Sequence, residues 1–222
     1  LPFESVKPSL LRAFFDHLTS RVSTNTAKAY LVDLRVLYNH IASLHDFGEN
    51  PFRKLDLARH SGRGLRALTA AQLSRIAALD GLAAPLQIAR DMFLLSFALA
   101  GINMCDLFNL MRPQGGRIFY ARQKTRERRS DGAAVSLALN PVAERLAAPY
   151  VAPPSSPFWL RFALEYSSSG AWLKMLNKNL KKVAKLADIN VPLSSYYARH
   201  SWASIARNDC NIDIFDIAQG LA

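Results

Sequence analysis

Residues Ser194–Ala206 read SSYYARHSWASIA and predict a helix that holds a single arginine, Arg199, in an apolar neighbourhood. Ser194 or Ser195 is the expected N-cap, because a serine hydroxyl can accept a backbone N–H of the first turn. Apolar side chains then recur at three- and four-residue spacing, which should turn one stripe of the helix toward a core: Ala198, Trp202, Ile205 and Ala206.

Arg199 brings a fixed positive charge into this neighbourhood. Burying a guanidinium in apolar surroundings costs free energy unless an anion such as a carboxylate or a phosphate pairs with it. Two interpretations follow from the helix alone: Arg199 pairs with a structural Asp or Glu, or it binds an anionic ligand. The rest of the chain favours the second.

The composition favours a polyanionic partner. The 222 residues hold 28 Lys plus Arg against 17 Asp plus Glu, a formal charge of +11. Nucleic acid is the first expectation and an anionic membrane surface the second. No apolar run reaches membrane-spanning length and no secretory signal pattern opens the chain, so we expect a soluble, intracellular protein. Cys105 and Cys210 stand far apart, support neither a disulfide framework nor a zinc site, and are expected in the core.

The first sixty residues predict a small helical domain. One apolar helical face follows Pro8, and a second, longer one follows Thr24 or Asn25 as cap. Residues 53–64, RKLDLARHSGRG, lose this periodicity and are expected to form a linker. The predicted domains are therefore 1–60 and 61–222.

The second domain reads as helices around a small sheet. Thr69 and Pro85 mark the starts of two helices, and Gly101 is expected to end the second one in a left-handed backbone conformation. Residues 102–111 predict a further short helix. In residues 117–122 and 134–139 the sequence changes from a helical to an alternating, two-residue pattern, which predicts two strands of a hairpin. Helices are expected again after Asn140, from Ala171 and at 212–220, whereas 159–170 carries no clear pattern. The predicted fold class is mainly α with a small antiparallel β-sheet.

Basic residues gather in two places in this domain. Seven lie between residues 112 and 129, against one acid, Glu127, and a lysine stripe follows the outer face of the helix from Ala171. Contact with DNA phosphates is the expectation, and for any one residue the alternative is a solvated surface. The candidate DNA-binding residues are Arg122, Arg126, Arg128, Lys178 and Lys182, with Lys28 in the first domain.

The run Tyr196–Ala203, YYARHSWA, resembles the second sequence box of the tyrosine recombinases, the phage-integrase family, in which a His-x-x-Arg-His pattern opens a helix. It is most similar to the Bacteroides-type branch, in which tyrosine takes the first histidine position, and this resemblance implies a bacterial cytoplasmic, nucleoid-associated protein. The run STNTAKAYLVDLRVLYNHI, 23–41, is similar to the core-binding domain of the same family. The resemblance implies a core-binding domain followed by a mixed α+β catalytic domain, chemistry without metal or other cofactor, and Arg199 as an arginine that clamps the scissile phosphate.

Lys124 lies where the family places its catalytic lysine, at the end of the first strand of a hairpin. Lysine suits proton donation to a leaving oxygen, because its ammonium releases a proton more readily than a guanidinium does. The alternative is one more phosphate-binding lysine of a basic loop. Arg122 lies on the same strand face by the two-residue period.

The first family box should fall on residues 98–110, ALAGINMCDLFNL, where Asn103 stands at the position of the other clamping arginine. An amide cannot supply a guanidinium's charge, so either another cation such as Arg122 reaches the phosphate or the site is weakened. Asp106 is expected to be structural. Tyr196 either donates a hydrogen bond to the phosphate or packs beside the pocket, and His200 is a secondary candidate.

The resemblance implies an attacking tyrosine after a Leu-Gly-His type motif, which residues 217–222 approach. Tyr197 is the last of the seven tyrosines, so the nucleophile is expected beyond Ala222, and this fragment should bind DNA without cleaving it. The expected function is site-specific DNA recombination through a 3′-phosphotyrosine, on double-stranded DNA, with a tetramer on paired sites and a monomeric fragment. The alternative is a degenerate DNA-binding architectural or regulatory protein. A metal-dependent nuclease is disfavoured, because no clustered carboxylates or histidine pairs occur.

Overall fold

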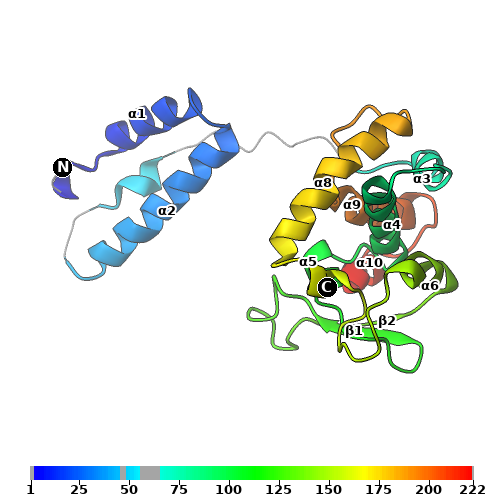
Figure 1. Ribbon diagram of the computed structural model, residues 1–222. Coiled ribbons are helices and arrows are strands. Elements are labelled where there is room, and N and C mark those ends of the chain that lie inside the picture. Colours follow the sequence, from blue (N-terminus) through cyan, green and yellow to red (C-terminus); the bar gives the residue numbers. More distant parts are fainter. Residues whose placement is uncertain (1–2, 46–48, 56–65, 222) are drawn as a thin grey trace. The chain divides into compact units, whose positions relative to one another are not determined.

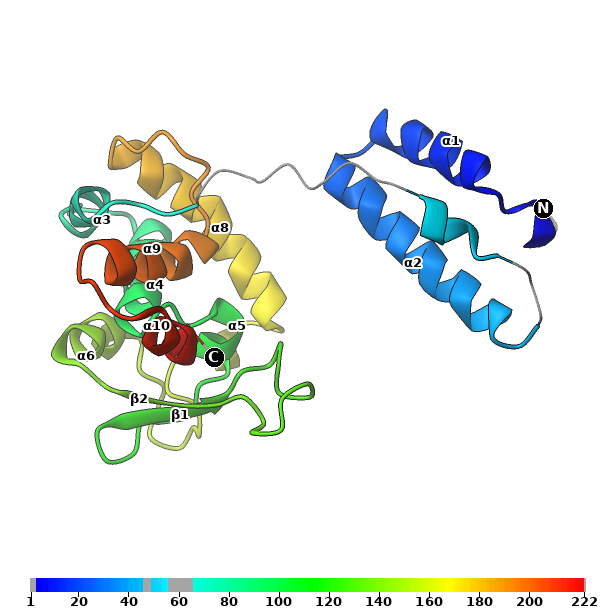
Figure 2. The same cartoon turned by 180° about the vertical axis from the view of Figure 1, so that it is seen from behind.

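A computed structural model describes residues 3–45, 49–55 and 66–221, and the chain divides into two compact units, Leu1–Arg63 (unit 1) and Gly64–Ala222 (unit 2) (Figures 1 and 2). The boundary expected from the sequence lies between residues 60 and 61. The predicted linker begins at Arg53, but Arg53 and Lys54 belong to a short 3-10 helix, and residues 56–64 of that segment lie outside the described residues.

The described residues of unit 1 form two α-helices and two short 3-10 helices. They are η1 (Phe3–Ser5), α1 (Pro8–Thr19), α2 (Thr24–Ala42) and η2 (Pro51–Lys54). The cap of α2 is Ser23 and not the expected Thr24 or Asn25, and the Ser23 hydroxyl accepts the N–H of Thr26 at 3.2 Å. Side chains from both helices and from η2 form its core: Leu11, Phe15, Ala27, Leu31, Tyr38 and Phe52.

The described part of unit 2 consists of helices and one two-stranded sheet. Its elements are α3 (Ala70–Ala77), α4 (Ala84–Ala98), α5 (Met104–Phe108), β1 (Arg117–Ala121), β2 (Ala134–Ala138), α6 (Pro141–Ala147), η3 (Ala148–Tyr150), α7 (Phe162–Glu165), α8 (Ser169–Leu186), α9 (Tyr196–Asn208) and α10 (Ile214–Leu221). The strands are antiparallel, with Arg117 opposite Ala138. The hairpin lies at one end of the unit (Figures 1 and 2). The predicted fold class, mainly α with a small antiparallel sheet, is confirmed.

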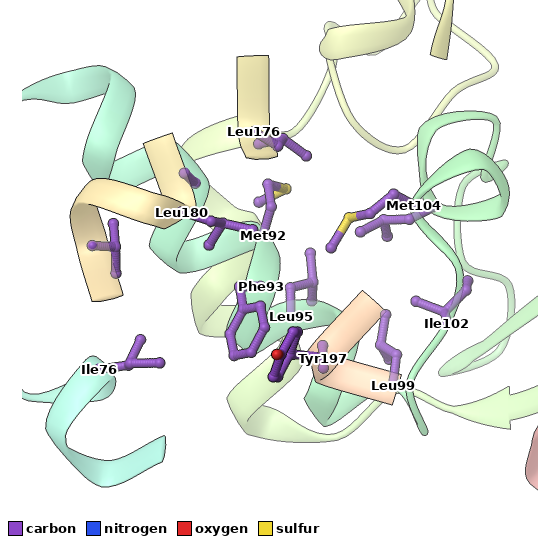
Figure 3. Packing of buried hydrophobic residues seen from close by; sticks show 14 of the residues in the cluster. Ile76, Met92, Phe93, Leu95, Leu99, Ile102, Met104, Leu176, Leu180 and Tyr197 are labelled. Carbon is purple, nitrogen blue, oxygen red and sulfur yellow. The ribbon is translucent and has the colours of Figure 1, made fainter. Parts of the chain in front are cut away.

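Helix α4 is the centre of unit 2. Its apolar residues occur almost all round, as in a helix that neighbours cover on several sides, and it packs against α8, α6 and α9. Figure 3 shows Met92 of α4 directed toward Leu176 and Leu180 of α8. These three side chains are completely shielded from solvent. Burial of this kind stabilises a fold by roughly 1.5–3 kcal/mol for each large apolar side chain.

Helix α9 is tied to the start of unit 2 by a buried hydrogen bond. The Ser201 hydroxyl, which has no solvent exposure, accepts the backbone N–H of Leu68 at 2.8 Å. The next element begins at Thr69, which forms the predicted cap of α3 and completes a capping box with Gln72. The segment before α3 is thereby fixed against the helix that carries Arg199.

Three further sequence-based expectations are wrong. Ser195 precedes α9 but its hydroxyl caps nothing; its backbone N–H instead donates to Asn177 Oδ1 at 2.8 Å, so the α8 side chain holds this turn. Cys210 is exposed rather than in the core, because it follows the last residue of α9 in the turn toward α10. The expected helix at 102–111 is shortened to α5, since Asn103 starts it and Asn109 ends it.

Candidate functional site

Arg199 lies on the buried side of α9 with only 8% of its surface exposed. Its Nη1 donates to the carbonyl of Gly101 at 3.0 Å, and its Nη2 donates to the carbonyl of Leu221 at the end of α10. Among the described residues no carboxylate forms an ion pair with it. The guanidinium is therefore held by neutral carbonyls, which satisfy its donors without neutralising its positive charge.

Gly101 fits closely against Arg199. Its φ is +70°, and a Cβ added there would lie 2.6 Å from Arg199 Cα. Its N–H donates to Ser96 O at 2.8 Å, and the buried Ser96 hydroxyl donates to Ile102 O at 2.7 Å. These bonds fix the turn after α4. Only glycine permits α9 to approach this turn so closely.

A second guanidinium, that of Arg122, lies near Arg199. Arg122 follows β1, and its backbone N–H donates to Ala133 O at 3.0 Å, which continues the hairpin ladder by one residue. Burial lowers the pKa of Arg199, and the positive charge of Arg122 lowers this pKa further. Three neighbours raise the pKa of Arg199 instead: Tyr120, Tyr196 and Asp106.

Asp106 is the one carboxylate in the Arg199 environment among the described residues. It is 5% exposed and accepts the backbone N–H of Gln123 at 3.1 Å. Burial raises its pKa, while the Gln123 hydrogen bond and the charges of Arg122 and Arg199 lower it. With at most one negative charge against two positive ones, the cluster retains a net positive charge that suits an anionic ligand.

Tyr120 completes this cluster from β1. Burial, and then the charge of Asp106, raise the pKa of its phenol to about 12, so the hydroxyl stays protonated near neutral pH. Sequence reasoning did not identify this residue. The signal was available in the strand period, because Ile118, Tyr120 and Arg122 occupy alternate positions and Ile118 is completely buried.

The other predicted site residues lie in different settings. Tyr196 is 42% exposed and meets the His200 ring edge to face, with 4.6 Å between ring centroids. Burial and the charges of Arg66 and Arg199 lower the pKa of His200, so its imidazole is neutral at pH 7. Asn103 caps α5, with Oδ1 accepting the N–H of Cys105 at 3.1 Å. Lys124 is exposed in the turn after β1, and no described residue forms a hydrogen bond or ion pair with its ammonium.

The basic segment 112–129 divides into engaged and available side chains. Arg112 donates to the carbonyls of residues 152, 153 and 156, and Arg117 to the Ser136 hydroxyl. Arg129 pairs with Asp131 at 2.5 Å. Arg126 is exposed, with a long 3.8 Å pair to Glu127, and Arg128 is exposed without an ion pair to a described residue.

The two candidate lysines of α8, Lys178 and Lys182, are exposed on the side away from the core, whereas Lys28 of α2 is only 7% exposed. No helix in the described part of the chain is long and apolar enough to cross a membrane. Likewise, residues 3–45, 49–55 and 66–221 contain no group of three or more His, Cys, Asp or Glu side chains placed to hold a metal ion.

Comparison with known proteins gives matches in structure alone. No family model and no curated protein sequence matches the chain. A solved structure of a lambda integrase (75–356) dimer bound to a COC′ core site matches with a TM-score of 0.72 and 14% identity, over 99% of this chain and 77% of that one. A lambda integrase tetramer bound to a Holliday junction matches with a TM-score of 0.67 and 15% identity, over 96% and 62%.

The integrase of the Tn1549 transposon (residues 82–397), in complex with circular intermediate DNA, matches with a TM-score of 0.70 and 13% identity, over 100% of this chain and 78% of that one. The expected resemblance to tyrosine recombinases and integrases is therefore confirmed at the level of the fold. At these identities the likeness concerns the fold, and residue roles rest on the geometry described above.

Proposed function

We propose that this chain is the DNA-binding and phosphate-clamping part of a site-specific tyrosine recombinase, which cuts and rejoins duplex DNA through a 3′-phosphotyrosine. The observation that carries the proposal is the Arg199 guanidinium, which is almost buried, lies near Arg122 and has no carboxylate ion pair among the described residues. A buried guanidinium beside a half-buried one favours an anion that both can contact. A phosphodiester in the recombinase fold supplies such an anion.

In this proposal Arg199 and Arg122 bind the non-bridging oxygens of the scissile phosphate. The transition state of phosphoryl transfer carries extra negative charge on these oxygens, and preorganised cations stabilise it. Arg122 supplies the charge that Asn103 cannot, since Asn103 stands where the family has an arginine and its side-chain oxygen caps α5. Asp106 acts as a positioning residue, because it holds the backbone that directly follows Arg122.

Lys124 is proposed as the proton donor to the leaving 5′-oxygen. Its exposed ammonium follows β1 on the segment that also carries Arg122. Tyr196 is proposed to donate a hydrogen bond to a phosphate oxygen, and His200 to support its ring from the side. Tyr197 is the last tyrosine and packs in the core (Figure 3), so the proposal assigns the attacking tyrosine to a segment outside these 222 residues.

The proposed partner is double-stranded DNA. The charge of +11 and the exposed basic side chains Arg126, Arg128, Lys178 and Lys182 support contact with its phosphates. The matched lambda integrase forms a tetramer on a Holliday junction. We extend that assembly to the complete recombinase on paired sites and propose unit 1 as the core-binding domain.

The test is covalent trapping of the complete gene product on a nicked duplex that carries a site selected from a random DNA pool. The Arg199→Ala and Arg122→Gln variants should each slow adduct formation by about 10²–10³-fold, the usual cost of one transition-state donor. Arg75→Ala is the matched control, because Arg75 is an exposed unit 2 arginine paired with Asp188. An adduct that forms at the same rate in all four proteins would contradict the assignment.

A second candidate is a DNA-binding architectural protein of the same fold that does not cut. The Asn103 cap favours it, because this side chain serves α5 where a clamping arginine is expected. In that case the complete gene product binds the selected duplex tightly but forms no adduct. The trapping assay therefore separates the two candidates directly.

A further inference from the structure

Unit 1 contains a polar pocket that is separate from the Arg199 site. It has a volume of about 300 Å³ and is lined by Arg35, Asn39, Asn50, Phe52 and Arg53. Arg35 and Asn39 lie one turn apart on α2, and the other three residues come from η2 and its cap. We call this the η2 pocket.

The η2 pocket is held by well-defined local structure. Asn50 caps η2 by accepting the backbone N–H of Phe52 at 3.0 Å. The Phe52 ring is 8% exposed and packs against Tyr38 of α2, with 5.5 Å between ring centroids. This aromatic contact fixes η2 against α2. The arginine that follows, Arg53, is exposed, as is Arg35.

The hydrogen bonds determine which polar atoms remain at the pocket. A backbone N–H can only donate, so the Asn50 atom that meets Phe52 N must be its oxygen. The Asn50 nitrogen then donates to Asn39 Oδ1 at 2.8 Å, which identifies the Asn39 oxygen as an acceptor. Both amide oxygens are engaged, whereas no described residue accepts from Asn39 Nδ2. The atoms that remain at the pocket are chiefly donors.

The charged side chains that line the pocket are both positive, so they favour the same kind of ligand as the free donors, an anion that accepts hydrogen bonds. Among the described residues, neither Arg35 nor Arg53 forms an ion pair and no carboxylate lines the pocket. The neighbouring Glu49 is paired with Lys54 at 2.7 Å. Two guanidiniums and an amide donor around one small volume match the requirements of a phosphate group, which accepts hydrogen bonds and carries negative charge.

We propose that the η2 pocket binds a backbone phosphate of duplex DNA, as an anchor that belongs to unit 1 alone. The inference rests on the proposed DNA-binding function and adds a contact outside the Arg199 site. A phosphate contact fixes position without reading bases, so it should act equally on duplexes of different sequence. A free phosphate or nucleotide offers the same chemistry and is the alternative source.

The first experiment measures the affinity of the full chain for two unrelated fluorescein-labelled duplexes by fluorescence anisotropy, from about 0.05 to 0.2 M KCl. Arg35→Gln and Arg53→Gln should each reduce the slope of log K against log salt by about one, equally for both duplexes. Arg21→Gln is the matched control, because Arg21 is an exposed arginine of unit 1 that precedes α2, whereas Arg35 lies about 16 Å along the helix from its first residue, Thr24. It should leave the slope within error of wild type.

An unchanged slope in the Arg35→Gln, Arg53→Gln double variant would overturn the inference, as would equal losses in Arg21→Gln or a loss on one duplex only. The proposed recombinase function fails differently, through absence of duplex binding by the wild type or absence of an Arg199-dependent adduct. A second measurement follows the side-chain amide NMR signals of Asn39 and Asn50. Shifts on addition of duplex support the proposal, whereas shifts with sodium phosphate and none with duplex assign the pocket to a free anion and overturn it.

Discussion

Replacing Gly101 by alanine tests how the chain positions Arg199. Gly101 has φ +70° and its carbonyl accepts from Arg199 Nη1, and an added Cβ would meet Arg199 Cα at 2.6 Å. A backbone atom cannot move aside as the tip of a flexible side chain can. The substitution should therefore push α9 away from the turn after α4 and displace the guanidinium.

The expected loss of stability has two parts. A left-handed backbone costs an L-residue roughly 1–2 kcal/mol, and overpacking a tight contact costs about 1–3 kcal/mol. The sum for Gly101→Ala is about 2–5 kcal/mol. Gly81→Ala is the matched control, because Gly81 has φ +62° and no atom within 4 Å of an added Cβ, so only the first part, about 1–2 kcal/mol, applies.

Urea unfolding followed by tryptophan fluorescence is the appropriate assay. All three tryptophans, Trp159, Trp172 and Trp202, lie in unit 2, so the signal reports the unit that contains Gly101. The reasoning requires Gly101→Ala to be clearly less stable than Gly81→Ala. Equal losses in the two variants would show that α9 does not depend on the close approach at Gly101.

Three further predictions concern neighbouring features of unit 2. Because burial raises the pKa of Asp106, the wild type should lose stability relative to Asp106→Asn as the pH rises through that pKa. Urea unfolding of both proteins from about pH 4 to 7 measures this difference, and the opposite trend would contradict the prediction. The His200 imidazole should titrate below 6.5 by NMR, so that its contribution to folding weakens as the pH falls through this range; a midpoint above 6.5 would disprove its burial beside Arg199. Thr69→Ala removes half of the capping box with Gln72 and should cost about 1 kcal/mol in the same fluorescence assay, whereas an unchanged midpoint would refute the cap.

Local signals allowed much of the fold to be predicted. Alternation over 117–122 and 134–139 identified the hairpin to within one residue of β1 and β2, because strand burial has a two-residue period. Thr69 and Pro85 marked α3 and α4 correctly, because caps and first-turn prolines act within one turn. The mainly α fold followed from such short-range rules.

Long-range contacts could not be predicted in the same way. The hydroxyl of Ser194 or Ser195 was expected to cap α9, yet the Asn177 side chain, eighteen residues before Ser195, accepts the Ser195 backbone N–H. Cys210 was expected in the core from its residue type, but the end of α9 leaves it exposed. The close approach of Gly101 to Arg199 joins positions 98 residues apart, and no spacing rule anticipates it.

The same contrast between local signals and long-range contacts applies to the candidate site. Arg199 was identified from the sequence because a charged residue interrupts an apolar helical stripe. Its association with Arg122 and Asp106 depends on how the hairpin and α5 meet α9, and the strand period alone indicated that Tyr120 shares a face with Arg122. Lys124 remains a prediction, since the described part of the chain provides it with no partner.

The central claim is that Arg199 and Arg122 share one anion, and a titration with sodium phosphate tests it most directly. The guanidinium Nε–H NMR signals of both arginines should shift together and saturate at one phosphate concentration, and Arg122→Gln should weaken the response of Arg199. The Nε–H signal of Arg90, which is paired with Asp91 at 2.8 Å, should stay in place as an internal control. If Arg199 does not respond, or responds equally in Arg122→Gln, the two guanidiniums do not form a common phosphate site.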